Sequence, residues 1–443
     1  MKTKNITIDG LSRREFIMIT SVAAAGLLSG CATNPVTGKS QLMLMSEAQE
    51  ISIDKTQSPH QFSSDYGFVR DKALRDYISH TGKQMTAKTH RTRMPYAFKC
   101  VNANYVNAYA FPGGSIACTR GILLSLENEA ELAALLGHEL GHVNARHTAE
   151  IMSKSMLTSA VVGGLSMYAG TTLGSGFGQM ASQLGQLGTG ALLASYSRDN
   201  ERQADSLGME YMVKTGYSPN GMVGLMEMLN TMNKHKMSAA QILFATHPMS
   251  SERYRTSVSD ADTLYKAYKK QPVYRDRYMD HTARLRKKKG AIEKMQKGEA
   301  KLGQKKYGEA ENLFQSALKQ APDDYVGLLM MAKCQLMQDK NKEAARYAEK
   351  AKKVYPDEAQ AYHISGITRI RNKKYEAAHD DFVAYDKILP GNPNTTFYKG
   401  LALEGMEKIE PSAKEYYKYL QSVKQGRQAK YAYNRLKAWG YIK

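Results

Sequence analysis

The sequence is poor in cysteine, in acidic side chains and in long apolar runs. It has 4 cysteines among 443 residues, and its 42 acidic side chains face 62 basic ones, for a formal net charge of +20. The apolar runs do not make the several convincing membrane-spanning helices that an intramembrane enzyme needs. No zinc-finger spacing and no basic platform with interleaved aromatic residues is present, so the positive charge does not indicate nucleic-acid binding. With 42% apolar and 23% charged residues, a chain of this length predicts two or three globular units.

The first 30 residues have the organisation of an export signal. The pair Arg13-Arg14 precedes an apolar run over residues 17–28, and this run ends in Leu28-Ser29-Gly30-Cys31. A charged stretch, a short apolar core and small residues before a cleavage site predict a signal peptide over residues 1–30. The ending resembles a bacterial lipobox, which predicts a lipidated Cys31, and the arginine pair resembles a twin-arginine signal. Ala32 resembles the sorting pattern for the outer membrane, so we expect a periplasmic, lipid-anchored protein at that membrane.

Three cysteines follow Cys31. Cys100 and Cys118 fall in β-prone segments of one expected sheet, and an oxidising periplasm would permit them to pair. Cys334 lies in a helical pattern as a small apolar residue. The odd number leaves one free thiol, and both a structural disulfide and three free thiols remain compatible with the sequence.

The segment after the leader is expected to be a tether over residues 31–60. Beyond it, short β-prone runs occupy residues 97–101, 106–110 and 115–118, and Pro112-Gly113-Gly114 separates the last two. Such runs, broken by turn residues, predict a small antiparallel sheet.

No charged residue occurs between Lys154 and Arg198, and glycine is frequent there. So much glycine is incompatible with a continuous stable helix. The segment could be a mobile lid over an active site, a membrane-dipping element or a buried hairpin of small residues. We expect helical segments with a flexible middle near the cleft.

The last third of the chain repeats with a period of 34 residues. Ala310, Ala344 and Ala378 keep this period, and so do the three prolines at 322, 356 and 390. A 34-residue period of small residue, aromatic residue and closing proline resembles the tetratricopeptide repeat. We expect an all-α repeat domain over residues 291–443, preceded by a basic linker over 271–290. Stacked helix pairs form a concave surface, which predicts polypeptide binding.

The segment His138-Glu139-Leu140-Gly141-His142 is expected on a helix that begins at Asn128, because Glu131 completes a capping box and apolar residues follow at helical spacing. Residues four apart share a helix face, so both imidazoles can reach one metal ion. Glu139 points off that face and can act as a general base towards water at the metal. Two surface histidines on an amphipathic helix would show the same pattern, so the pattern alone is only moderately specific.

A catalytic zinc needs a third protein ligand. The extended metzincin pattern is excluded, because Thr148 occupies the position of its third histidine. His147 is one residue early and is interpreted as structural or as a support for a ligand. A second helix offers Glu201 as the ligand, with Asp205 one turn on to accept a hydrogen bond from a liganding imidazole. This is the gluzincin arrangement.

Several segments in order are similar to the HtpX/CAAX-prenyl-protease superfamily of zinc metallopeptidases, and the repeats make the chain similar to BepA-like periplasmic proteases. The resemblance implies a zincin-like α+β peptidase domain over residues 61–270, so that the whole chain is mainly α. It also implies one Zn²⁺ per chain on His138, His142 and Glu201, and a substrate cleft bordered by residues 107–114, where an extended peptide could add as a strand. A lipoprotein leader is a departure from soluble relatives. The segments are Val106 to Gly114, Thr119-Arg120-Gly121, His138 to His147, Glu201 to Asp205, and Thr246-His247-Pro248 up to Arg253.

The resemblance implies cleavage of misfolded or stalled envelope proteins, with outer-membrane β-barrels as clients and the outer-membrane assembly machinery as a partner. The alternative function is a chaperone or assembly scaffold with a mostly latent peptidase. His247 bears on this choice, because it could stabilise the oxyanion, occupy the open zinc position, or only cap a helix before Pro248. Arg253 could stabilise charge or form an ion pair near Glu201.

Overall fold

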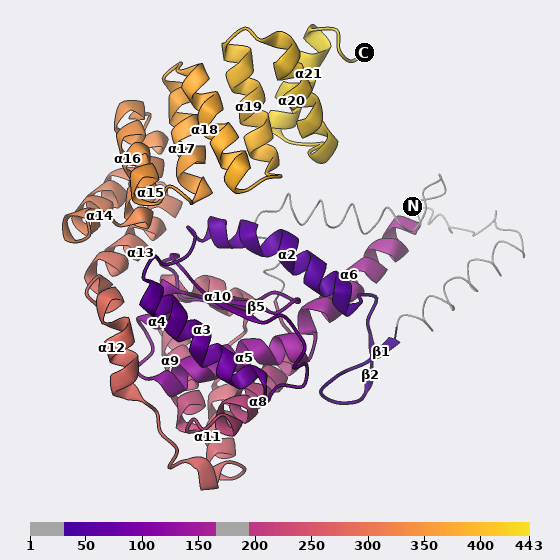
Figure 1. Cartoon of the computed structure of the whole chain (residues 1–443), viewed down its shortest axis with the longest axis vertical. Coiled ribbons are helices and arrows are strands. Elements are labelled where there is room, and N and C mark those ends of the chain that lie inside the picture. Colours follow the sequence, from indigo (N-terminus) through magenta and orange to yellow (C-terminus); the bar gives the residue numbers. More distant parts are fainter. Residues whose placement is uncertain (1–30, 165–194) are drawn as a thin grey trace, which may run out of the picture.

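The computed structural model describes residues 31–164 and 195–443. The expected signal peptide and most of the glycine-rich segment, including its possible role as a lid, lie outside these residues. The described chain is mainly helical, with a small sheet in its N-terminal half and a row of helix pairs in its C-terminal half (Figure 1). This confirms the predicted fold class. Among the described helices, none has both the length and the apolar character needed to cross a membrane.

The predicted tether over residues 31–60 is wrong for most of its length. Strands β1 (Cys31–Thr33) and β2 (Ser40–Leu42) form an antiparallel hairpin, and the long helix α2 (Glu47–Ser64) follows. Ser46 and Gln49 form a capping box at the start of α2. Most of the buried positions of α2 carry polar residues. The sequence therefore lacks the apolar period that would predict a helix here.

The sheet is mixed, with the order β3-β5-β4. Strand β4 (Ala108–Ala110) pairs antiparallel with β5 (Ser115–Thr119), as predicted, but β3 (Ala97–Val101) pairs parallel with β5. The chain crosses from β3 to the far edge before the hairpin returns β5 to the centre, which the strand sequences alone do not reveal. Cys100 and Cys118 lie opposite each other in the parallel pair, and both are free thiols.

Helices pack on and around this sheet to form the N-terminal unit. At its centre, α5 packs against α8, α9 and α3, and most of the buried apolar side chains of this unit belong to one continuous core. The bounds are α3 Lys72–Thr86, α4 Arg120–Leu123, α5 Glu129–Asn144, α6 His147–Gly164, α8 Arg198–Lys214, α9 Asn220–Lys234, α10 Gln241–Thr246 and α11 Ser251–Asp262, with 3₁₀ turns η1 (Ser238–Ala240) and η2 (Lys266–Tyr268).

The predicted linker over residues 271–290 is largely helical. Helix α12 (Arg275–Arg286) buries Tyr278, whose hydroxyl donates to the Leu123 carbonyl at 2.7 Å. Arg286 also donates to the Leu126 carbonyl, at 2.5 Å. The segment is thus a helix that packs on the N-terminal unit, and it is not a solvated linker.

The repeat domain contains four helix pairs and a final helix. The repeated Ala310, Ala344 and Ala378 are fully buried, each in the second helix of its pair. The turns repeat as well, because Lys305, Asp339, Lys373 and Glu407 all have positive φ at 34-residue spacing. The pairs are α13 (Lys289–Gly303) with α14 (Tyr307–Gln320), α15 (Tyr325–Met337) with α16 (Asn341–Val354), α17 (Ala359–Arg371) with α18 (Tyr375–Ile388), and α19 (Pro393–Gly405) with α20 (Ile409–Ser422), followed by α21 (Arg427–Ala438).

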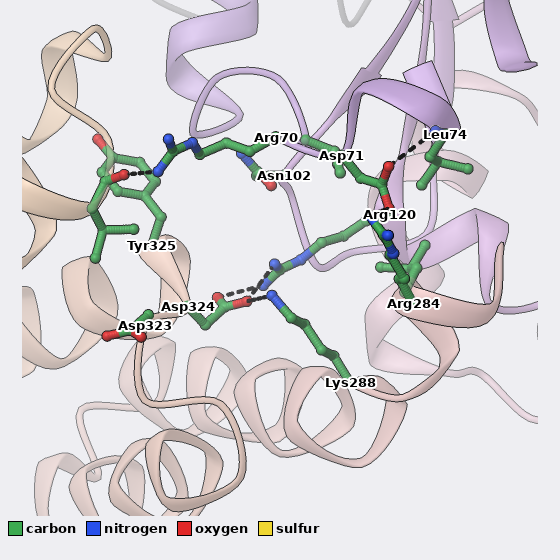
Figure 2. Close-up of a pocket in the computed structure, with 13 residues that line it drawn as sticks. Arg70, Asp71, Leu74, Asn102, Arg120, Arg284, Lys288, Asp323, Asp324 and Tyr325 are labelled. Carbon is green, nitrogen blue, oxygen red and sulfur yellow. Dashed lines mark hydrogen bonds and ion pairs between the residues drawn. The ribbon is translucent and has the colours of Figure 1, made fainter. Parts of the chain in front are cut away.

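A buried ion pair joins the two halves. Arg120, directly after β5, donates to both carboxylate oxygens of Asp324, at 2.8 and 2.9 Å, and Asn104 accepts from the same guanidinium. Asp324 is also the N-cap of α15 in the second repeat. The pair lies beside a pocket of about 280 Å³ that residues of the N-terminal unit, α12 and the repeats line together (Figure 2). Since Arg120 and Asp324 are both almost fully buried, this contact fixes the first repeats against the N-terminal unit.

Candidate metal centre

Helix α5 runs through the middle of the core. Asn128 caps its first turn by accepting from the Glu131 backbone N–H, as the sequence predicts, and all of its residues from Glu129 to Asn144 are buried. A helix buried on all sides leaves its polar side chains without solvent, so they must find partners inside the protein. His138, Glu139 and His142 are the polar groups at its centre.

Helix α8 approaches α5 at the distance of backbone contact. A Cβ atom on Gly208 would lie 2.7 Å from the His138 backbone nitrogen, and a Cβ on Gly141 would lie 2.9 Å from the Ala204 Cα. Gly137 faces Gly208 in the same way. Small residues four apart on both helices thus form two facing stripes, and this close approach carries Glu201 to the imidazoles of α5.

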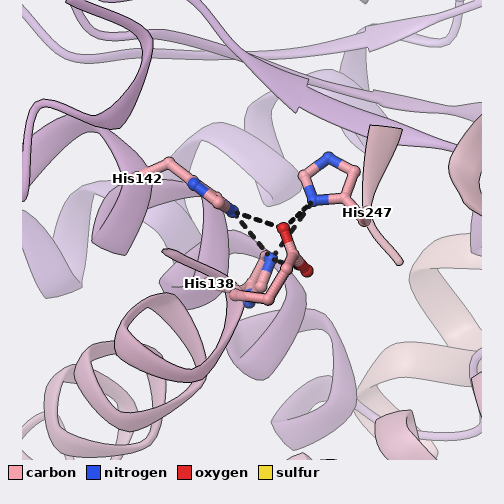
Figure 3. A group of neighbouring side chains, drawn as sticks. His138, His142 and His247 are labelled. Carbon is pink, nitrogen blue, oxygen red and sulfur yellow. Dashed lines mark hydrogen bonds and ion pairs between the residues drawn. The ribbon is translucent and has the colours of Figure 1, made fainter. Parts of the chain in front are cut away.

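Four side chains converge on one point (Figure 3). A tetrahedral zinc with bonds of about 2.0–2.1 Å spaces its ligand atoms about 3.3–3.4 Å apart. The observed separations bracket this value, so the donor set fits a zinc ion. They are 3.1 Å between His138 Nε2 and His142 Nε2, 3.4 Å between His142 Nε2 and Glu201 Oε1, 3.7 Å between His138 Nε2 and Glu201 Oε2, 3.0 Å between His247 Nδ1 and Glu201 Oε1, and 3.4 Å between His138 Nε2 and His247 Nδ1.

Polar contacts on the outer side of both α5 histidines favour the tautomer that a metal ligand needs. Asp205 Oδ1 lies 2.8 Å from His138 Nδ1, so it holds the proton there and leaves Nε2 free to face the centre. His142 Nδ1 lies 2.9 Å from His147 Nδ1, and His147 Nε2 lies 2.9 Å from the Gln203 amide oxygen. Because that oxygen can only accept, the protons run from His147 to Gln203 and from His142 to His147. Burial lowers the pKa of His142 well below its usual value, which keeps the imidazole neutral.

Arg253, at the start of α11, joins the two acidic residues of α8. It donates to both oxygens of Asp205 at 2.7 Å, and its Nη1 lies 2.6 Å from Glu201 Oε2. Burial alone would raise the pKa of Asp205, but Arg253 lowers it. Burial likewise opposes ionisation of Glu201, yet His247 and His142 hold the pKa of that carboxyl well below its usual range. Both carboxylates therefore stay charged, and Arg253 makes an ion pair with each.

Glu139 has no such partners. Its Oε2 atom is buried without a hydrogen bond among the described residues, and its Oε1 atom lies 3.9 Å from His247 Nε2. Burial raises the pKa of this carboxyl. A raised pKa makes the group a better proton acceptor than an exposed glutamate.

His247 directly follows α10, and its side chain reaches the centre formed by α5 and α8. Burial would lower its pKa, but Glu201 and Glu139 on either side raise it. Its backbone N–H donates to the Leu243 carbonyl at 2.7 Å, so the residue also ends α10. Its Nδ1 atom is one of the four converging atoms, 3.0 Å from Glu201 Oε1 and 3.4 Å from His138 Nε2.

Two residues at the centre, Tyr196 and Gln203, are not predicted from the sequence. The Tyr196 ring stacks on His142 with centroids 3.8 Å apart, and its backbone N–H donates to the Thr246 carbonyl, next to His247. Gln203 orients His147. Tyr196 lies at the end of the uncharged segment and Gln203 between the two acidic residues of α8, and neither fits a ligand pattern. Of the predicted site residues, the structure brings together His138, Glu139, His142, Glu201, Asp205 and His247. The structure does not describe the side chain of Cys31.

Comparison with known proteins agrees with this geometry. Residues 72–258 match Peptidase family M48, and residues 301–365 match the tetratricopeptide repeat. The "Beta-barrel assembly-enhancing protease" of Yersinia pestis is 27% identical over 422 residues, which cover 88% of this chain and 84% of the relative. The protein of the same name from Escherichia coli K12 is 27% identical over 44% of this chain, a match that spans only 40% of the relative. "Metalloprotease YcaL" of the same strain is 34% identical over 36% of this chain and 59% of its own length.

The chain therefore carries a metalloendopeptidase domain of Peptidase family M48, followed by tetratricopeptide repeats.

Proposed function

From a family M48 domain joined to tetratricopeptide repeats, we propose that this protein is a zinc endopeptidase of the bacterial envelope that degrades misfolded or stalled outer-membrane proteins. The peptidase domain would span residues 61–270, and the repeats over 291–443 would recruit the client polypeptide. The observation that carries the proposal is the convergence of His138 Nε2, His142 Nε2 and a Glu201 carboxylate oxygen at zinc-ligand spacing in a buried site.

In this mechanism, His138, His142 and Glu201 hold one Zn²⁺, which supplies a Lewis acid for activating water and polarising a peptide carbonyl. Glu139 accepts the proton of the attacking water at Oε2, the atom that has no other partner among the described residues, and passes it to the leaving amine. Asp205 and His147 keep the two imidazoles in the liganding tautomer.

The envelope location rests on the leader and on the names of the relatives. The lipobox-like ending predicts that Cys31 is lipidated and anchored in the outer membrane. Two relatives are named for β-barrel assembly, and this supports unfolded or misassembled envelope proteins, and the outer-membrane assembly machinery, as partners. The peptide strand would lie along the β4 edge, since β4 is one of the two edge strands of the sheet among the described elements and belongs to the segment expected to border the cleft.

A second function is favoured by one observation. His247 Nδ1 lies 3.0 Å from the Glu201 carboxylate and 3.4 Å from His138 Nε2, so it would be able to take the position that a catalytic zinc keeps open. Four protein ligands would make a closed site, and a closed site is latent. The protein would then act mainly as a chaperone or assembly scaffold, with hydrolysis switched on when His247 leaves the metal.

The test measures zinc stoichiometry and casein cleavage of the purified protein. Glu139→Gln is expected to bind one zinc per chain and to lose cleavage by about 10²–10⁴-fold, because the general base is gone while the ligands remain. Undiminished cleavage in this variant would exclude the mechanism. A variant that fulfils every cellular role without cleavage would favour the scaffold.

The same assay decides the role of His247. If this side chain closes the site, His247→Ala raises casein cleavage at unchanged zinc content. If it stabilises the transition state, cleavage falls. His235→Ala is the matched control, because His235 is exposed at the C-cap of α9 and is not one of the converging residues.

A further inference from the structure

The inner surface of the first repeats is already occupied by the chain itself. Ser63, at the end of α2, donates to the buried Glu358 of the third repeat. The ammonium of Lys333 lies 4.9 Å from the centre of the Tyr66 ring. Glu299 of the first repeat accepts from the Asn104 side-chain amide at 2.7 Å. These contacts cover part of the first repeats, whereas the distal end of the row projects away from the sheet (Figure 1).

Charges in the middle of the row are balanced. Asp381 accepts from Lys352 at 2.7 Å and pairs with Arg369 at 2.9 Å. Lys399 pairs with Asp386 and Glu415, at 2.6 and 3.3 Å. The buried and half-buried cations in this part of the row therefore already have anionic partners.

The distal end is different. After Glu415 the sequence has no acidic residue, whereas seven Lys and Arg residues follow. Lys424, Arg427 and Lys430 are exposed, and none of their side chains has an ion pair or hydrogen bond among the described residues. The three line one open groove of about 720 Å³ between the end of α20 and the start of α21. Its other lining residues are Leu420, Gln425, Gly426, Ala429 and Tyr433.

We propose that this groove, the distal basic groove, binds an acidic segment of a polypeptide. Three like charges around one concavity repel one another unless an anion lies between them, so they complement carboxylates. Tyr433, with 45% of its surface exposed, and the side chain of Leu420 add an apolar floor suited to the backbone and side chains of an extended chain. A concave groove between two helices fits a polypeptide better than a flat lipid surface.

The acidic segment would belong to the client polypeptide that the repeats recruit, so the proposal rests on the proposed function. The distal basic groove would hold an acidic segment of the client while the joined first repeats keep the peptidase site close by. The interaction is predominantly ionic and solvent-exposed, so it weakens when salt is raised above about 0.1 M, where the Debye length is about 10 Å.

The test is fluorescence anisotropy with the zinc-loaded full chain and a fluorescein-labelled flexible peptide built from Glu, Gly and Tyr. The same peptide with Gln in place of Glu is the probe control. The triple variant Lys424→Gln/Arg427→Gln/Lys430→Gln is expected to bind the Glu peptide about tenfold more weakly than the wild type, and salt should weaken only the wild-type interaction strongly.

A matched variant separates this groove from the overall charge. Lys342→Gln/Lys350→Gln/Lys353→Gln removes three exposed cations of α16 that have no ion pair within residues 31–164 and 195–443, and this variant should bind like the wild type. Equal loss in both triple variants, or equal binding of the Glu and Gln peptides, overturns the proposal. If phosphatidylglycerol vesicles bind and depend on Lys424, Arg427 and Lys430 while the Glu peptide does not bind, the groove is a lipid site and the proposal is wrong.

The proposed peptidase mechanism and the proposal for the distal basic groove can be disproved separately. The anisotropy assay needs no cleavage, so a Glu139→Gln protein that still cleaves casein overturns the proposed mechanism without changing the peptide affinity. Conversely, wild-type affinity for the Glu peptide in the Lys424, Arg427 and Lys430 variant overturns the groove even if Glu139 is essential for cleavage.

Discussion

At the residue scale, the position of two protons decides whether the centre can hold a metal. His138 and His142 each have two nitrogens, and only the tautomer protonated at Nδ1 leaves Nε2 free to bind. Asp205 selects this tautomer at His138 by a direct contact of 2.8 Å, whereas His142 depends on the neutral His147 and on Gln203 beyond it. A charged carboxylate thus orients His138, whereas a neutral chain of two hydrogen bonds orients His142.

Replacing Asp205 by Asn should lower zinc affinity about 10–100-fold, because the amide can present its NH₂ group to His138 and favour the wrong tautomer. Competition with a chromophoric chelator measures the change directly. Asp199→Asn, an exposed position on the same helix, should leave the affinity unchanged. An Asp205→Asn protein that folds and binds zinc as tightly as the wild type would show that the tautomer is set elsewhere.

At the scale of elements, the contact between α5 and α8 controls the ligand geometry. The helices touch through Gly137 and Gly141 on one side and Ala204 and Gly208 on the other. Any side chain at these positions moves α8 outwards and takes Glu201 away from the two imidazoles. The glycines on α5 cost helix propensity, and the close approach explains why they are present.

Gly208→Ala should destabilise the protein by about 1–3 kcal/mol, because the new Cβ would lie 2.7 Å from the His138 backbone nitrogen, which cannot move away alone. Denaturant unfolding measures the loss, and weaker zinc binding should accompany it. Gly308→Ala is the control, since nothing lies within 4 Å of its Cβ on α14. That substitution should stabilise by up to about 1 kcal/mol through helix propensity.

At the scale of the whole molecule, the two halves are joined by buried charge. Arg120 and Asp324 pair almost without solvent, and the half-buried Glu299 and the buried Glu358 lie at the same junction. Burial raises the pKa of Glu299 and of Glu358, whereas Arg120 lowers the pKa of Asp324 against the effect of burial. The junction therefore responds to both mutation and pH.

Removing one partner of the buried pair should be costly. Arg120→Ala leaves the buried Asp324 with only the half-exposed Lys288, at 4.0 Å, as an ionic partner. Removing one partner of a buried pair typically destabilises by about 3–5 kcal/mol. The double variant Arg120→Ala/Asp324→Ala should lose much less than the sum of the single changes, as a double-mutant cycle of unfolding free energies will show. Lys72→Ala breaks an exposed pair on α3 and should change stability little. Additive losses would mean that the two side chains do not interact.

Glu299 predicts a pH dependence. Since its folded pKa is raised above the unfolded value of about 4.3, its neutral form favours folding, and stability declines as pH rises from that value through the raised pKa. Glu299→Gln keeps the amide contact with Asn104 available and should flatten this decline. Unfolding free energies measured across that window test the sign. Glu343→Gln, at an exposed position on α16, should leave the slope unchanged.

The strongest sequence predictions depend on local spacing. The four-residue interval of His138 and His142 on a capped helix, the one-turn interval from Glu201 to Asp205 and the 34-residue period of Ala310 all follow from helix geometry, which the chain specifies by itself. The helix over residues 47–64 is not predicted from the sequence, because its buried residues are mostly polar and show no apolar period.

The sequence by itself determined that two histidines share a helix face, that an acidic pair lies on a second helix and that the repeats follow one period, because each property involves neighbours along the chain. Only the tertiary structure decided that β3 pairs parallel with β5, that Tyr196 stacks on His142 and Gln203 contacts His147, and that His247 lies beside Glu201 and His138. These contacts join residues that no helix or strand period relates, and the approach of Glu201 to His138 and His142 depends on the close packing of α5 against α8.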